Sequence, residues 1–259
     1  MTSTFSPREM RLLLAVLAIA AIAAAGPFLA QAPDYHRFAD QQVRWGVPHA
    51  GDVLSNLAFV IAGVFGAWRL RLADGLGRVE RSLGALACAG LVLTAFGSGW
   101  YHLQPDDTRL VADRLAMSVV FAGVLGLAAC RVSARAGAAL AMLVLAAAPA
   151  AVMFWSATGD LWPWAVLQGG GMVLLVVLAF SAGDRAAAPV RWGWVVAAYA
   201  LAKLLEFGDH ALWHAAGQWL SGHSLKHVVA ALAVWPVFAA WRPALPARHN
   251  ERRTARTAG

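Results

Sequence analysis

The chain has little charge and almost no cysteine. Only 14% of its 259 residues are charged while 60% are hydrophobic, and an ordinary soluble domain has an apolar share nearer half. The two cysteines, Cys88 and Cys130, both fall inside apolar stretches, where small buried packing residues are expected rather than a disulfide or a pair of metal ligands. The composition therefore excludes an ordinary soluble domain and indicates one integral membrane domain.

The chain also lacks a concentrated basic stripe, an internal repeat and a phosphate-binding loop. Its net charge of +7 is spread over short segments and the C-terminal tail, so a nucleic-acid partner is not expected. The run Gly169-Gly170-Gly171 has no strand before it and no lysine after it. Close packing of helices through small residues is the expected use of this run in a membrane.

Eight apolar segments are present instead. The first, Leu12 to Leu29, is long enough to cross or nearly cross a bilayer. Ala30-Gln31-Ala32 imitates a signal-peptide cleavage site, but Pro33 would follow the scissile bond and oppose cleavage, so we expect a retained helix. The other segments lie at 52–70, 82–102, 109–130, 136–155, 162–181, 190–212 and 222–241.

The pattern predicts an all-α integral membrane protein. A seven-helix bundle is expected over 52–241, with an additional N-terminal transmembrane helix or signal anchor in 1–30, which makes eight helices. Residues 31–51 are predicted to form an interfacial loop, and 242–259 a basic, disordered cytoplasmic tail.

Arginine predicts the orientation of these helices, because cytoplasmic segments keep positive charge during insertion. With the N-terminus inside, fifteen arginines fall on the inner side and only Arg37, Arg44 and Arg109 on the outer side. We therefore expect a multi-pass protein of a bacterial inner membrane, with both termini in the cytoplasm. This topology brings 98–102, 113 and 223–227 to one depth near the outer, periplasmic leaflet.

Those positions hold the residues that suggest chemistry. His223 and His227 open the last segment four residues apart, which on a helix lets both imidazoles reach one metal ion. His102 is the best candidate for a third ligand, and Ser98 shares its helix face. Asp113 follows His102 by eleven residues, across a short turn, and is the candidate acid/base group.

Two other groups of polar residues are candidates, one for metal binding and one for ion pairs between helices. In Asp209-His210-Ala211-Leu212-Trp213-His214 a second histidine pair has the same spacing, although histidine near tryptophan also suits an interfacial anchor. Ionisable groups are costly inside a membrane, so each needs a partner or a function. Lys203 is expected to pair with Glu206 or Asp209 and so tie helices together.

In these residues the chain resembles the alkaline ceramidase family, as a distant member of bacterial type. The wider superfamily of seven-helix membrane hydrolases includes adiponectin-receptor-like and GPI-lipid-remodelling proteins. The shared pattern is a serine, a histidine four residues later, an aspartate after ten more residues, and a late His-x-x-x-His. This sequence matches it at Ser98, His102, Asp113, His223 and His227, and the resemblance extends from about Asp52 to Trp241.

The resemblance implies one zinc ion per chain, held by His102, His223 and His227, with Ser98 and Asp113 as catalytic residues. Family members also hold calcium through an acidic N-terminal segment ahead of a Ser-Asn pair. Here Ser55-Asn56 is present, but the preceding residues read Pro48-His49-Ala50-Gly51-Asp52. Calcium dependence is therefore not expected.

Three imidazoles leave a fourth zinc position for water, which the metal activates at neutral pH. Asp113 would move the proton and Ser98 would donate to the developing oxyanion. The expected activity is cleavage of the amide bond of ceramide, or of a related membrane lipid amide, to a fatty acid and a long-chain base. A lipid esterase or phospholipase with the same zinc site, and a receptor or transport protein without enzymatic activity, are the alternatives.

Overall fold

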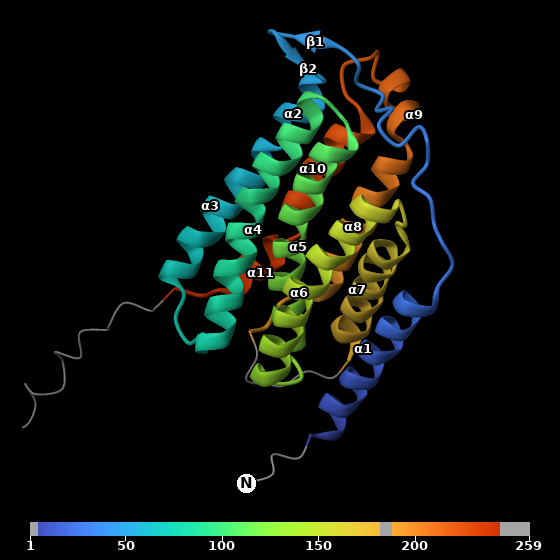
Figure 1. Ribbon diagram of the computed structural model, residues 1–259. Coiled ribbons are helices and arrows are strands. Elements are labelled where there is room, and N and C mark those ends of the chain that lie inside the picture. Colours follow the sequence, from blue (N-terminus) through green and yellow to red (C-terminus); the bar gives the residue numbers. More distant parts are fainter. Residues whose placement is uncertain (1–4, 182–187, 244–259) are drawn as a thin grey trace, which may run out of the picture.

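The computed structural model describes residues 5–181 and 188–243, and in them the fold is almost entirely helical (Figure 1). The basic tail therefore lies almost wholly outside the described residues. In chain order the elements are α1 (Pro7–Ala25), β1 (Val43–Arg44), β2 (Val47–Pro48), α2 (Ala50–Leu54), α3 (Leu57–Leu72), α4 (Arg78–Leu103), α5 (Asp107–Ala129), α6 (Ala134–Thr158), α7 (Trp162–Phe180), α8 (Trp192–Phe207), α9 (Asp209–Ala215), α10 (Gly222–Leu232) and α11 (Trp235–Ala240).

Each apolar segment coincides with one helix or with two helices in succession, and three segments are interrupted. Between α2 and α3, the Asn56 side-chain amide donates to the backbone oxygen of Asp52, and such a local bond competes with the helical pattern. Gly208 separates α8 from α9. Pro236 lies in the first turn of α11, where its missing N–H ends the preceding helix at little cost.

Within residues 5–181 and 188–243, six helical segments are long and apolar enough to cross a membrane: 50–72, 78–103, 107–129, 134–158, 162–180 and 222–240. The two other predicted crossings do not meet these requirements of length and composition, for different reasons. The helix α8 has only 16 residues, and α1 carries Arg8, Glu9 and Arg11 in its first turns. The structure thus shows an all-α protein of membrane type, and the number of eight crossings stays a prediction.

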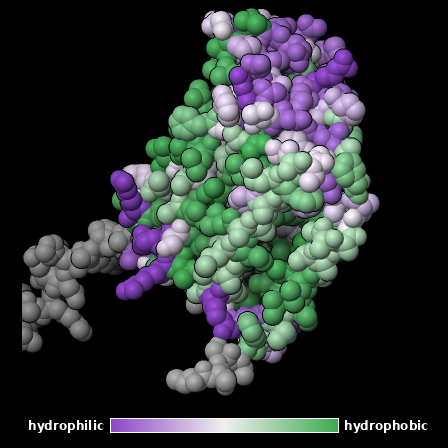
Figure 2. All heavy atoms as spheres, viewed as in Figure 1, coloured by the Kyte–Doolittle hydropathy of each residue, from purple (hydrophilic) through white to green (hydrophobic). Residues whose placement is uncertain are grey.

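The surface agrees with a membrane environment. Figure 2 shows hydrophobic side chains over the body of the bundle, with hydrophilic side chains gathered at the end that carries β1, β2 and α9. The predicted interfacial loop forms a short antiparallel hairpin at that end, pairing Val43 with Pro48 and Arg44 with Val47. It also turns inward, because Phe38, Ala39 and Asp40 are buried.

The N-terminal helix is fastened to the bundle at two levels. A Cβ atom on Gly170 of α7 would come within 2.6 Å of Ile19 of α1, so the glycine run does serve close helix packing. At the start of α1, the Ser133 hydroxyl, the Ser6 backbone N–H and the Arg135 guanidinium donate to Glu9 and lower the pKa of its carboxyl group to about 2.

The helices α4 and α5 pack closely and share the most extensive contact among the described helices. A Cβ atom on Gly90 would come within 2.5 Å of the backbone nitrogen of Val120, and one on Gly123 within 2.6 Å of that of Ala87. Glycine at both positions lets the two backbones approach. Because only residues 104–106 join the two helices, the end of α4 and the start of α5 are held together.

Candidate metal centre

Three histidines meet inside the bundle, near the end that carries β1, β2 and α9. His102 lies in the last turn of α4, and His223 and His227 lie on the first turns of α10. All three are buried, and one ligand atom from each lies within 4.8 Å of the others. Among the described residues this is the one group of three or more histidine, cysteine, aspartate or glutamate side chains arranged to hold a metal ion.

The spacing of the imidazoles suits a metal. The Nε2 atoms of His102 and His223 are 3.2 Å apart. Zinc binds histidine nitrogen at about 2.0–2.1 Å, so two ligands in a tetrahedral site are separated by roughly 3.3 Å. This pair thus has the separation that zinc requires, and the donor atom of His227 lies within 4.8 Å of the other two.

His227 is oriented by a residue from the break between α2 and α3. The Ser55 hydroxyl lies 2.8 Å from Nδ1 of His227 and donates its own hydrogen to the backbone oxygen of Asp52. Because a hydroxyl has one hydrogen, Ser55 must accept from His227, which places the ring hydrogen on Nδ1. Nε2 of His227 is then a free donor atom for a metal, the arrangement usual around zinc-binding histidines.

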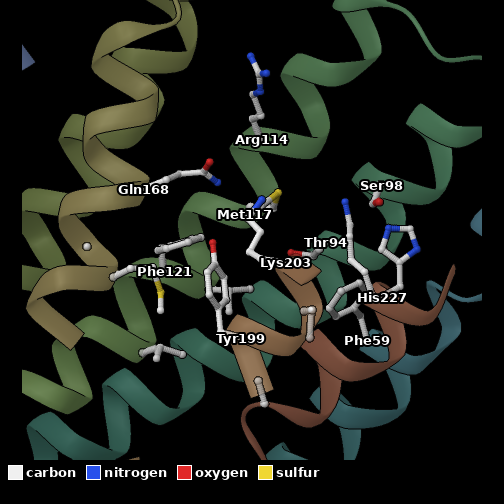
Figure 3. Close-up of a pocket in the computed structure, with 18 of the residues that line it drawn as sticks. Phe59, Thr94, Ser98, Arg114, Met117, Phe121, Gln168, Tyr199, Lys203 and His227 are labelled. Atoms are coloured by element: carbon white, nitrogen blue, oxygen red, sulfur yellow. The ribbon is translucent and has the colours of Figure 1, made fainter. Parts of the chain in front are cut away.

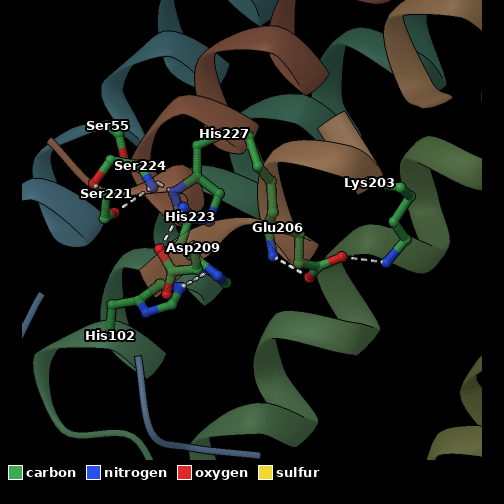
Figure 4. A network of polar contacts seen from close by, with 10 residues as sticks. Ser55, His102, Lys203, Glu206, Asp209, Ser221, His223, Ser224 and His227 are labelled. Atoms are coloured by element: carbon green, nitrogen blue, oxygen red, sulfur yellow. Dashed lines mark hydrogen bonds and ion pairs between the residues drawn. The ribbon is translucent and has the colours of Figure 1, made fainter. Parts of the chain in front are cut away.

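Two buried carboxylates hold the start of α10 in place. Oδ1 of Asp52 accepts from the hydroxyls of Ser221 and Ser224, at 2.8 and 2.7 Å. Asp209 accepts from the backbone N–H of His223 at 2.8 Å and from that of Ala39 at 2.9 Å. The predicted alternative pairing of Asp209 with Lys203 is not found in the described residues, because Asp209 instead fixes the first turn of α10, which carries His223 and His227 (Figure 4).

An aromatic side chain covers the histidines from the interfacial loop. The ring of Phe38 lies with its centre 4.8 Å from that of His102 and 4.4 Å from that of His223. Phe38 is itself buried. This cover shields the cluster on the side of the loop.

Ser98 and Asp113 come together beside the cluster. Ser98 lies one turn before His102 on α4, and its hydroxyl faces the carboxyl group of Asp113 on α5. Both residues line a cavity of about 190 Å³, as does His227 (Figure 3). All five residues predicted from the sequence are thus gathered at one place.

The cavity lies among α4, α5, α7, α8 and α10 and is mostly apolar. Its aliphatic wall includes Val124, Leu175 and Val195. Its polar residues include Ser98, Asp113, Tyr199, Gln168 and the ionic side chains of α8 and α10. A mostly apolar chamber with a few polar groups suits an amphiphilic ligand.

The rival histidine pair is placed elsewhere. His210 and His214 lie on α9 and are exposed. Nε2 of His210 is 3.1 Å from the backbone oxygen of Arg37, so this side chain contacts the interfacial loop. Neither residue belongs to the metal-binding group.

The sequence and the structure were also compared with known proteins. No family model matches the chain, and no curated protein or solved structure matches it either. The resemblance to alkaline ceramidases therefore depends on the spacing of Ser98, His102, Asp113, His223 and His227.

Proposed function

We propose that this protein is a zinc-dependent membrane hydrolase that cleaves the amide bond of a membrane lipid. The observation that carries the proposal is the position of the three buried histidines beside an apolar cavity that Ser98 and Asp113 also line. A metal site that served only to clamp helices would have no need of this chamber.

The donor set supports a catalytic site over a closed structural one. Structural zinc sites have four protein ligands, whereas catalytic sites have three and keep one position open. Among the described residues, no fourth histidine, cysteine, aspartate or glutamate joins His102, His223 and His227. When bound, zinc would supply a Lewis acid that activates water at neutral pH.

The chain's own residues would carry the other roles. Asp113 would take the proton released as water attacks and deliver it to the leaving amine. Ser98 would donate a hydrogen bond to the oxygen that becomes negative in the transition state. Phe38 would keep bulk water from reaching the histidines through the loop.

The substrate would be a lipid whose acyl chain lies along Val124, Leu175 and Val195, with its scissile bond near His227. Ceramide or a related lipid amide fits this description, and the products would be a fatty acid and a long-chain base or another amine. The arginine distribution favours entry from the outer leaflet.

The test is a hydrolysis assay on purified protein of measured zinc content. A panel of lipid amides and matched esters is incubated with the wild-type chain and with His227→Ala, and released fatty acid is quantified. Zinc-dependent release from amides supports the proposal. Release from esters alone would indicate an esterase or phospholipase, and no release from any lipid would favour a receptor or transport protein.

A further inference from the structure

An ionic cluster forms part of the cavity wall. Glu206 of α8 lies between two lysines, accepting from Nζ of Lys226 at 2.7 Å with one carboxylate oxygen and from Nζ of Lys203 with the other (Figure 4). The predicted pairing of Lys203 with Glu206 is thus confirmed. All three side chains also line the cavity together with Ser98, Asp113 and His227, so they do more than tie α8 to α10.

The charges that line this cavity do not cancel. Lys203, Lys226 and Arg114 carry three positive charges, and Asp113 and Glu206 carry two negative charges, which leaves a surplus of one positive charge with the histidines neutral. The buried carboxylates of Asp52 and Asp209, which hold the start of α10, would offset the charge of a bound zinc ion, so the surplus of the cavity wall remains. Unbalanced charge within a membrane protein is costly, and such residues mark the sites where charged ligands bind.

Of the three cations, Lys226 is the one whose charge acts on all three histidines and on Asp113. It lies between His223 and His227 in the sequence of α10. Its ammonium group has three hydrogens, and the contact with Glu206 uses one of them. An anionic group of a ligand in the cavity could accept from another of these hydrogens, and His227 lines the same cavity.

We propose that the lipid amide taken by this site carries a carboxylate next to its amide group, as an N-acyl amino acid does, and that Lys226, supported by Lys203, binds that carboxylate. This inference rests on the proposed function and narrows its substrate class. One carboxylate balances the surplus charge of the cavity wall, whereas neutral ceramide leaves that charge unpaired. In the reaction, water breaks the C–N bond: the acyl carbon gains hydroxyl to become a fatty acid, and the nitrogen gains hydrogen to become an amino acid.

Binding is tested with two sulfonamides that resist hydrolysis, hexadecylsulfonyl-glycine and hexadecylsulfonyl-ethanolamine. They share one chain and differ in a carboxylate against a neutral hydroxymethyl group. The full-length, zinc-containing protein should bind the glycine compound about tenfold more tightly or better, the ratio expected for a hydrogen bond between charged groups. Lys226→Met should abolish the preference and Lys226→Arg should retain it.

Glu206→Gln is a matched control for which the opposite change in binding preference is expected. It removes one negative charge and keeps the shape of the side chain, so the preference for the glycine compound should increase. If the cluster has only a structural role, Lys226→Met and Glu206→Gln should each weaken the binding of both compounds equally. Equal binding of the two sulfonamides by the wild-type protein would overturn the inference.

Hydrolysis assays separate this inference from the proposed function. N-oleoylglycine, ceramide and an N-acylphosphatidylethanolamine, which carries a phosphodiester, are compared on the same preparation. Preferred binding of the glycine sulfonamide without hydrolysis of any amide would uphold the binding site and refute the hydrolase. Cleavage of ceramide or of the phosphodiester lipid in preference to N-oleoylglycine would uphold the hydrolase and overturn the carboxylate site.

Discussion

The Nε2 atoms of His102 and His223 face one another at 3.2 Å, although the two residues come from helices that lie far apart in the sequence. Two neutral imidazoles at this separation share either one hydrogen or one metal ion. His227 completes a triangle of donors around the same point. The metal interpretation leads to measurable consequences for each side chain that supports the triangle.

Removal of one histidine should remove the metal. We expect the wild-type protein to contain about one zinc ion per chain, and His223→Ala or His227→Ala to lose most of it, because two ligands hold zinc far more weakly than three. Zinc content is measured by atomic absorption on purified protein. His210→Ala serves as the control, and loss of zinc in this variant with retention in the other two would transfer the site to α9.

The hydroxyl of Ser55 should matter for affinity without being a ligand. Ser55→Ala removes the acceptor that holds the hydrogen of His227 on Nδ1, and the loss of such supporting contacts lowers metal affinity by about 10- to 100-fold. Competition with a chelator measures the apparent zinc dissociation constant. Ser55→Thr keeps the hydroxyl group and should stay close to wild type, and equal affinity in all three proteins would contradict the orienting role.

Much of this arrangement was predicted from the sequence because it depends on local patterns. Apolar runs predict helices one by one, and the spacing of His223 and His227 places both on one face of α10. His102 is the candidate third ligand because it shares a helix face with Ser98, and the arginine distribution independently places it at the same depth as His223 and His227.

The supporting contacts could not be predicted in this way. Ser55 contacts His227 across 172 positions of sequence, and Phe38 covers the histidines from a loop with no periodic pattern. The burial of Asp52 against Ser221 likewise depends on how the break between α2 and α3 meets α10. Such contacts follow from the tertiary packing, and no local sequence pattern predicts them.

Labelling with membrane-impermeant thiol reagents tests the orientation. Asp74→Cys, in the loop within 71–81, should be protected in intact cells, and Gln104→Cys, in the loop within 103–108, should react. The native Cys88 and Cys130 are buried and should give little background. The reverse pattern would place the metal centre at the inner leaflet and change the lipids that can reach it.

Ser98 should contribute to turnover and not to metal binding. Its hydroxyl lines the cavity beside His227, so Ser98→Ala is expected to retain zinc and to lower turnover by about 10² to 10³, the cost of losing one donor to an oxyanion. Fatty-acid release and zinc content are measured on one preparation. Unchanged turnover would remove Ser98 from the chemistry.

The most direct test of the hydrolase is the turnover of Asp113→Asn at full zinc occupancy, measured as fatty-acid release from the best lipid amide. Asp113 lies beside Ser98 and outside the three-histidine group, so asparagine should leave the fold and the zinc intact. Without a group that accepts the proton, turnover should fall by about 10² or more. Loss of zinc together with activity would make Asp113 a ligand, and wild-type turnover with zinc retained would contradict the proposed catalytic role of Asp113.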